Sequence, residues 1–192
     1  REHAEAVVRE WRDDNAALID EALQADLIVL QRVAMSENVQ RLLEAAHVQG
    51  KKVIFDTDDL IFEPQMTQWH RGVARLSEAD QQLYADGVRR YLATLTMSDA
   101  VLVASPLLAE LAQQHGKPAF VHRNAIGREM QELADQLVAQ RPQRTDPDRV
   151  IIGYGSGTPT HDVDFEEVAS ALLDTLARHP HGCRARPNGT SR

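Results

Sequence analysis

The feature that most constrains the fold is a regular alternation of short apolar runs with longer segments of helical spacing. Five runs rich in valine and isoleucine have the length of β-strands: residues 27–30, 53–55, 101–104, 120–121 and 150–152. Runs that are apolar at successive positions are typical of strands covered on both faces, as in a parallel sheet. We therefore predict a parallel sheet whose strands are buried on both faces.

Four segments after these runs carry apolar residues at helical spacing: residues 39–46, 83–95, 108–112 and 165–176. Residues that commonly begin or end helices flank them. These signals are Ser77 with Asp80, Ser105 with Pro106, Asp164 with Glu167, and the glycines Gly50 and Gly116. Strands and helices in alternation, joined by right-handed crossovers, predict an open, Rossmann-like α/β sheet.

The alternation divides the chain into unequal parts. We expect an incomplete N-terminal domain over residues 1–126 and a helix with a linker over 127–149. Residues 150–179 look like the first βα unit of a second, truncated domain, and a unit of this size cannot bury its own core. Residues 180–192 have no apolar period, so we expect an unstructured tail, either native or produced by a frameshift. The whole pattern indicates a fragment of a longer protein.

Composition excludes several classes of protein. The chain has 192 residues and a formal net charge of -8, whereas binding to nucleic acid favours a basic surface. Its single cysteine, Cys183, excludes an internal disulfide and a cysteine-based zinc site. No apolar run reaches the roughly 20 residues of a membrane span, and no signal segment is evident. We therefore expect a cytoplasmic protein that does not bind nucleic acid.

The strongest chemical signal is a group of aspartates, Asp56, Asp58 and Asp59, directly after the apolar run at 53–55. In open α/β sheets, ligands bind beyond the carboxyl ends of the strands. Such carboxylates can ligate a divalent metal, accept a phosphoryl group or act as a base toward a sugar hydroxyl. They can also form a solvated acidic turn that caps a short helix. The residues from 60 to 76, with weak periodicity, are expected to form a long loop.

A second signal is a glycine-rich loop between the run at 150–152 and the helical segment that follows. Glycines allow backbone amides to approach an anion, and a helix N-terminus adds a favourable dipole. The loop has neither the P-loop pattern nor the dinucleotide-binding spacing. It is either an anion site or a flexible turn. Its candidate residues are Gly155, Ser156, Gly157, Thr158 and His161.

The string VIFDTDDLIF resembles the first motif of haloacid-dehalogenase phosphatases. That resemblance implies Asp56 as nucleophile and Asp58 as acid/base, with Ser105 in the place of the second motif. Leu60 departs from the motif, and no Gly-Asp-x-x-x-Asp pattern follows a strand. A phosphatase of this type is therefore one alternative function. A non-catalytic α/β binding domain is another.

The ordered set of motifs resembles a different family over residues 25–179. The strings are ADLIVLQR, VIFDTDDLIF, SDAVLVASPLLAEL, FVHRNAI and IGYGSGTPTHDVDF. Together they are similar to bacterial glycosyltransferases of the GT-B fold, in particular to the group 1, or family-four, enzymes. This resemblance implies two Rossmann-like domains that face each other, with the acceptor on the N-terminal domain and the nucleotide-sugar donor on the C-terminal one.

The resemblance also implies roles for particular residues. Asp58 and Asp59 would be catalytic, near the reacting sugar, and the glycine-rich loop would lie against the donor phosphates. No cofactor and no metal are implied, and the acceptor would be a glycan, a lipid-linked sugar or another hydroxyl compound, with peripheral contact with a membrane. The resemblance places the family's acidic donor motif further along the second domain than residues 1–192 reach, so we expect this chain alone to be inactive. The acceptor side would be lined by Arg32, Asp56, Trp69, His70 and Asn124.

Overall fold

The structure is a computed structural model that describes residues 5–67, 70–140, 152 and 162–179. The chain divides into two compact units. The first comprises Arg1–Trp69 and Leu76–Ala125, and the second comprises His70–Arg75 and Ile126–Arg192.

The first unit contains a sheet of four parallel strands in the order β1-β2-β3-β4. The strands are β1 (Leu27–Gln31), β2 (Lys52–Thr57), β3 (Ala100–Val103) and β4 (Ala119–Val121). Each agrees with a predicted run to within two residues, which confirms the open, Rossmann-like α/β sheet. The fifth predicted strand, at 150–152, falls outside the described residues except for Ile152, which is not in a strand.

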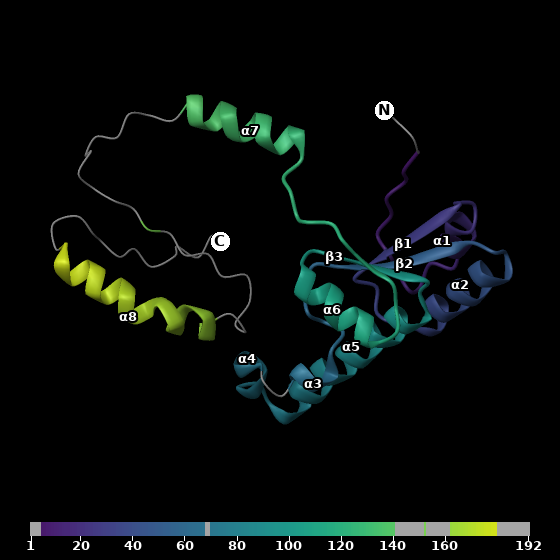
Figure 1. Cartoon of the computed structure of the whole chain (residues 1–192), viewed down its shortest axis with the longest axis horizontal. Coiled ribbons are helices and arrows are strands. Elements are labelled where there is room, and N and C mark those ends of the chain that lie inside the picture. The colour runs from purple at the N-terminus through teal and green to yellow at the C-terminus, as the bar shows by residue number, and fades with distance from the viewer. Residues whose placement is uncertain (1–4, 68–69, 141–151, 153–161, 180–192) are drawn as a thin grey trace. The chain divides into compact units, whose positions relative to one another are not determined.

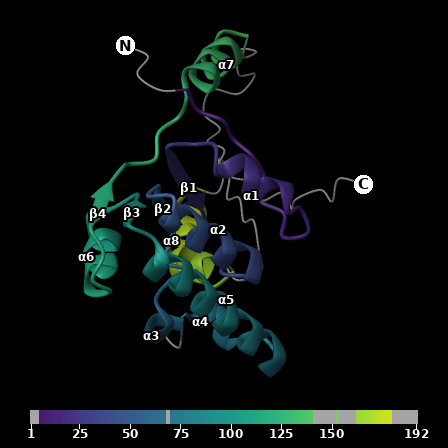
Figure 2. The same cartoon turned by 90° about the vertical axis from the view of Figure 1, so that its right-hand side faces the viewer.

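Three helices connect these strands and lie on one side of the sheet (Figure 1, and from the side in Figure 2). They are α2 (Glu37–Val48), α5 (Glu78–Met97) and α6 (Pro106–Gln114). Each right-handed crossover leads to the next strand in the same direction across the sheet. All three helices are therefore placed against the same face. Two shorter helices, α1 (Ala17–Ala22) and α3 (Pro64–Thr67), complete the first unit.

The expectation that every strand is buried on both faces is wrong. Val53 and Phe55 are fully buried beneath the helices, but the side chains that point to the other face are partly open. Val29 is 49% exposed and Phe120 is 59% exposed. In β1 the burial alternates strictly from residue to residue. The physical reason is the strand order, because a sheet whose strands follow the chain order receives all its connecting helices on one face.

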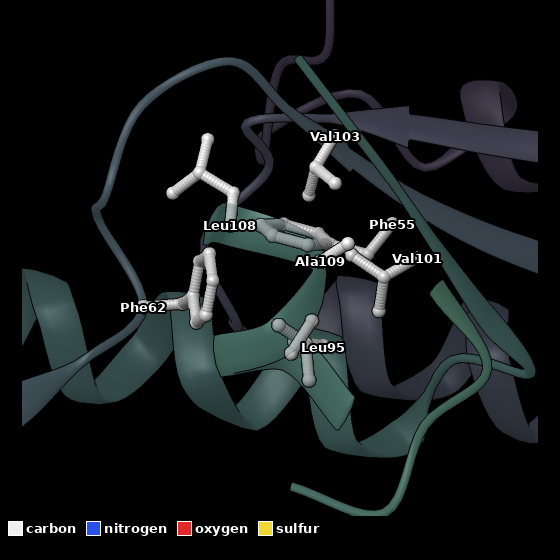
Figure 3. Packing of buried hydrophobic residues seen from close by; sticks show 8 residues of the cluster. Phe55, Phe62, Leu95, Val101, Val103, Leu108 and Ala109 are labelled. Atoms are coloured by element: carbon white, nitrogen blue, oxygen red, sulfur yellow. The ribbon is translucent and has the colours of Figure 1, made fainter. Parts of the chain in front are cut away.

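The side chains under the helices form a close-packed core (Figure 3). In this view Phe55 from β2 and Val101 and Val103 from β3 meet Leu95 of α5 and Leu108 of α6. Phe62 reaches the same cluster from the segment that follows the aspartates, and its side chain is fully buried. A second cluster packs α2 against β1 and β2 through Ile28, Leu30, Val39, Leu42, Leu43, Ala46 and Val53.

The predicted helix signals of the first unit are confirmed. Ser77 Oγ accepts a hydrogen bond from the backbone amide of Asp80 at the start of α5, and Ser105 Oγ caps α6 in the same way. Gly50 and Gly116 follow the ends of α2 and α6 with φ angles of 70° and 75°. A left-handed residue at this position is the usual end of a helix, and glycine adopts it without strain.

The expectation of one long loop over residues 60–76 is also wrong. The segment contains α3 and, in the second unit, α4 (Arg71–Ala74). His70 caps α4, where its Nδ1 accepts a hydrogen bond from the amide of Val73 at 3.4 Å. Helices of four residues are barely longer than one turn, so they show no apolar period in the sequence.

The second unit also holds α7 (Arg128–Ala139) and α8 (Asp162–Arg178). Helix α8 begins two residues before Asp164, so the predicted capping pair of Asp164 with Glu167 is wrong. Glu167 instead forms an ion pair with Arg71 of α4. The neighbouring Glu166 forms a bidentate ion pair with Arg75, which donates to both of its carboxylate oxygens at 2.9 Å. Within the described part of the chain, no helix has the length and apolar character needed to cross a membrane.

Candidate functional site at the carboxyl edge of the sheet

The candidate site lies where three strands of the first unit end. Arg32 directly follows β1, Asp58 and Asp59 directly follow β2, and Asn124 comes three residues after β4. The carboxyl ends of parallel strands meet at one edge of a sheet, so residues distant in sequence come together there. This edge is the usual ligand-binding edge of an open α/β sheet.

Arg32 joins the two aspartates through its guanidinium group. Its Nε donates a hydrogen bond to Asp58 Oδ1 at 2.8 Å, and its Nη2 donates both to the same oxygen and to Asp59 Oδ2, the latter at 2.6 Å. Asn124 Nδ2 donates to the other oxygen of Asp58 at 3.1 Å. Both carboxylate oxygens of Asp58 are thus engaged, whereas the side chain of Asp59 remains 59% exposed.

The backbone of Arg32 is itself unusual. With a φ of 50°, it is the only residue other than glycine with a positive φ in the described ranges. Its amide donates to the carbonyl oxygen of Asp56 at 2.9 Å, which continues the ladder between β1 and β2 beyond the last residue of β1. A left-handed conformation costs a residue with a side chain about 1–3 kcal/mol and persists only where the surroundings impose it.

A buried threonine fixes the turn that carries the aspartates. Thr57 is 1% exposed, and its Oγ1 donates to the carbonyl oxygen of Asp59 at 2.9 Å and accepts from the amide of Asp59 at 3.2 Å. Hydrogen bonds of this local kind stabilise tight turns. The alternation along β2 turns Thr57 toward the helices, so the core holds the base of the turn.

The surroundings shift the pKa values of two of the aspartates in opposite directions. Burial raises the pKa of Asp58, but the hydrogen bonds that it accepts from Arg32 and Asn124 outweigh this effect, so the pKa lies below its ordinary value. Burial and the nearby charge of Asp58 raise the pKa of Asp56, although a hydrogen bond from Gln31 opposes them. Asp58 is therefore the more firmly ionised carboxylate of the two.

Helix α5 adds two tyrosines near the cluster, which the sequence predicts only as part of the apolar face of that helix. Burial and the charge of Asp59 both raise the pKa of Tyr84. Tyr91, two turns further along α5, packs against the core cluster and interacts electrostatically with Arg32. The spacing of seven residues puts the two rings on one face of the helix and was the only signal in the sequence.

Asp99 is a structurally important residue that the sequence does not predict. It stabilises the opposite, amino-terminal edge of the sheet. Its carboxylate bonds the Lys52 ammonium at 2.7 Å and the Val53 amide at 2.9 Å, and its own amide donates to the Val53 carbonyl at 2.8 Å. The hydrogen bond from Lys52 is the main reason that the pKa of Asp99 is lowered. A lone aspartate before a strand carries no sequence signal for this structural role.

The remaining predicted site residues fall outside this cluster. His70 belongs to the second unit, where it caps α4. Trp69 and the whole glycine-rich loop, Gly155, Ser156, Gly157, Thr158 and His161, lie outside the described residues. Their proposed roles stay predictions.

The side chains of the cluster are suited to hydrogen bonds with a polar ligand. Carboxylate and amide oxygens accept hydrogen bonds from ligand hydroxyls, and an ionised carboxylate can take a proton from one. In the described part of the chain, no group of three or more histidine, cysteine, aspartate or glutamate side chains has the geometry to hold a metal ion.

No protein-family model matches the chain, and no curated protein matches it significantly. Fold and site together define a Rossmann-like α/β protein with a polar cluster at the carboxyl edge of its sheet.

Proposed function

We propose that this chain forms the acceptor-binding part of a glycosyltransferase that uses a nucleotide-sugar donor. The observation that carries the proposal is the network of Arg32, Asp58, Asp59 and Asn124 at the carboxyl edge of a parallel sheet. Sugars present several hydroxyl groups, and carboxylates with an amide are suitable partners for them. The ordered motifs of the sequence support the same reading.

Within this network the two aspartates take different roles. Asp58 is engaged on both oxygens and holds Arg32 in place, while the exposed Asp59 receives the acceptor hydroxyl. In the transfer step, the hydroxyl oxygen forms a bond to the anomeric carbon of the donor sugar, and the bond to the nucleoside diphosphate breaks. The hydroxyl proton passes to the carboxylate of Asp59, and the bonding electrons leave with the diphosphate.

The phosphatase alternative is less well supported. A phosphoryl-accepting aspartate is helped by a lowered pKa, and burial and the charge of Asp58 shift the pKa of Asp56 in the opposite direction. The second aspartate of that mechanism must exchange protons with the leaving group. Here Asp58 is bonded to Arg32 and Asn124, and its pKa is lowered.

Replacement of Asp59 by asparagine tests the proposal in two assays. In the chain itself, saturation-transfer NMR with a panel of mono- and disaccharides should detect binding to the wild type and a weaker signal for Asp59→Asn. In a protein that contains a complete donor-side domain, the same substitution should lower the rate of sugar transfer about 10²-fold or more, the usual contribution of a positioned base.

The matched control is Asp86→Asn, which removes an equally exposed aspartate on α5 from its pair with Arg89. This variant should behave like the wild type in both assays. Equal transfer rates in the Asp59→Asn variant and the wild type would contradict the proposal. So would magnesium-dependent hydrolysis of p-nitrophenyl phosphate that is lost in Asp56→Asn.

A further inference from the structure

The face of the sheet opposite α2, α5 and α6, here called the open face, carries apolar side chains (Figure 1). Paired residues on neighbouring strands point to the same face, so Val29, Ile54 and Ala100 form one row across three strands. Leu102 and Phe120 lie beside this row, closer to the carboxyl edge. Val29 is 49% exposed and Phe120 is 59% exposed. All-parallel sheets are almost always covered on both faces, so we expect a partner here.

Two opposite charges flank the apolar row at equal distances. Lys52 lies two residues before Ile54 on β2 and Asp56 lies two residues after it, and the alternation along the strand puts all three on the open face. Parallel strands rise about 3.3 Å per residue, so each charged residue is about 6.6 Å from Ile54 along the strand. The side chain of Lys52 is 70% exposed. It bonds Asp99, but an ammonium group has three donors and can bond a second carboxylate.

A second copy of the open face matches this arrangement of charges when its strands run in the opposite direction. A two-fold axis between the two sheets, along the row of Val29, Ile54 and Ala100, packs each of these residues against its own copy. The axis reverses the strands, so Lys52 of each copy faces Asp56 of the partner subunit. With the strands of the two copies parallel, like charges would face each other instead. Stacked sheets lie about 10 Å apart, a gap that side chains from both faces fill.

We propose that the open face is the interface of a two-fold homodimer in which two sheets stack with antiparallel strands, with Val29 and Ile54 on the axis. Apolar contact along the central row supplies the attraction between the copies. The pairs of Lys52 with Asp56 of the partner subunit fix the orientation, because the opposite orientation brings like charges together. The dimer rests on the open face alone and does not depend on the proposed glycosyl transfer.

Sedimentation velocity of the chain at about 0.15 M salt tests the proposal. At this ionic strength the Debye length is about 8 Å, so the repulsion between two copies that each carry a net charge of -8 is largely screened. The wild type should change from monomer to dimer over concentrations on the order of 10⁻⁶ to 10⁻⁴ M. Val29→Glu should weaken association at least about a hundredfold, because it places two like charges together at the axis.

A mixing experiment tests the position of the axis. Val29→Lys should weaken association as strongly as Val29→Glu, whereas an equimolar mixture of the two variants should form dimers, because opposite charges then meet at the axis. Asp56→Lys should weaken association at least about tenfold, since it places like charges opposite each other at both ends of the row. This variant replaces Val29→Glu if circular dichroism shows that the latter is unfolded.

Val48→Glu is the matched control, because Val48 is 89% exposed at the end of α2, on the helical side of the sheet. It makes the same change in residue type and charge and should dimerise like the wild type. A wild type that stays monomeric over the whole range would mean that another part of the chain or a different protein covers the open face, and it overturns the proposal. Equal association of Val29→Glu and Val48→Glu would mean that the copies meet through another surface and also overturns it, as does a mixture of the two Val29 variants that stays monomeric.

Discussion

Replacement of Phe62 by alanine is the sharpest test of how the core supports the aspartate turn. The ring is fully buried three residues after Asp59 and belongs to the cluster around Phe55 and Leu95 (Figure 3). Phenylalanine-to-alanine changes in cores cost about 3–5 kcal/mol, because apolar contact is lost and a cavity remains. Phe62 also meets the His115 ring edge-on, with centroids 6.3 Å apart and planes at 79°, so the upper half of this range is expected.

Such a loss is a large part of the roughly 5–15 kcal/mol that stabilises a typical domain. Urea denaturation followed by far-ultraviolet circular dichroism should show a lower midpoint for Phe62→Ala with an unchanged slope. Leu83→Ala is the control, because Leu83 is 71% exposed on α5 and its truncation should change the unfolding free energy by less than about 0.5 kcal/mol. A loss below about 1 kcal/mol for Phe62→Ala would refute the packing argument.

Two further substitutions probe the opposite edges of the sheet by the same denaturation assay. Asp99→Asn should lower the unfolding free energy at pH 7 by about 1.5–3 kcal/mol, the usual contribution of hydrogen bonds to a charged group. The folded-state pKa of Asp99 is lowered, so this contribution is present above the ordinary aspartate pKa near 4 and is lost as the pH falls through the folded-state value. The difference in unfolding free energy between Asp99→Asn and the wild type should therefore disappear in acid. A difference in unfolding free energy that does not change with pH would contradict this role for the Asp99 carboxylate. Thr57→Val keeps the shape of the side chain but removes both hydrogen bonds to Asp59, and it should cost about 1–2 kcal/mol; a neutral effect would mean that the turn does not depend on them.

The sequence contained enough information for the strands and the long helices. The runs at 53–55 and 101–104 are short, β-branched and followed by polar residues, so both the strands and their carboxyl ends could be located. The serines at 77 and 105 marked the helix starts because an N-cap residue must satisfy amides that the helix itself leaves open. The location of Asp58 and Asp59 at a ligand-binding edge followed from β2 alone.

Other features depend on contacts that have no local signal. The open face of β1 follows from the order of the strands, which the residues of β1 do not encode. Asp58 accepts hydrogen bonds from Arg32, which lies 26 positions away in the sequence, and from Asn124, which lies 66 positions away. The sequence predicts Arg32 as a site residue but not its left-handed backbone, because no local pattern favours that conformation for arginine.

If the site binds the acceptor as proposed, the left-handed backbone of Arg32 places two demands on one residue, thermal stability and ligand binding. Glycine would adopt a φ of 50° freely and would relieve this strain of about 1–3 kcal/mol, but it would leave Asp58 and Asp59 without their guanidinium. In a library randomised at this position, selection for heat resistance alone should enrich glycine and asparagine. Selection for occupancy of the site should instead return arginine, so a disagreement between the two screens would locate the function without any knowledge of the substrate.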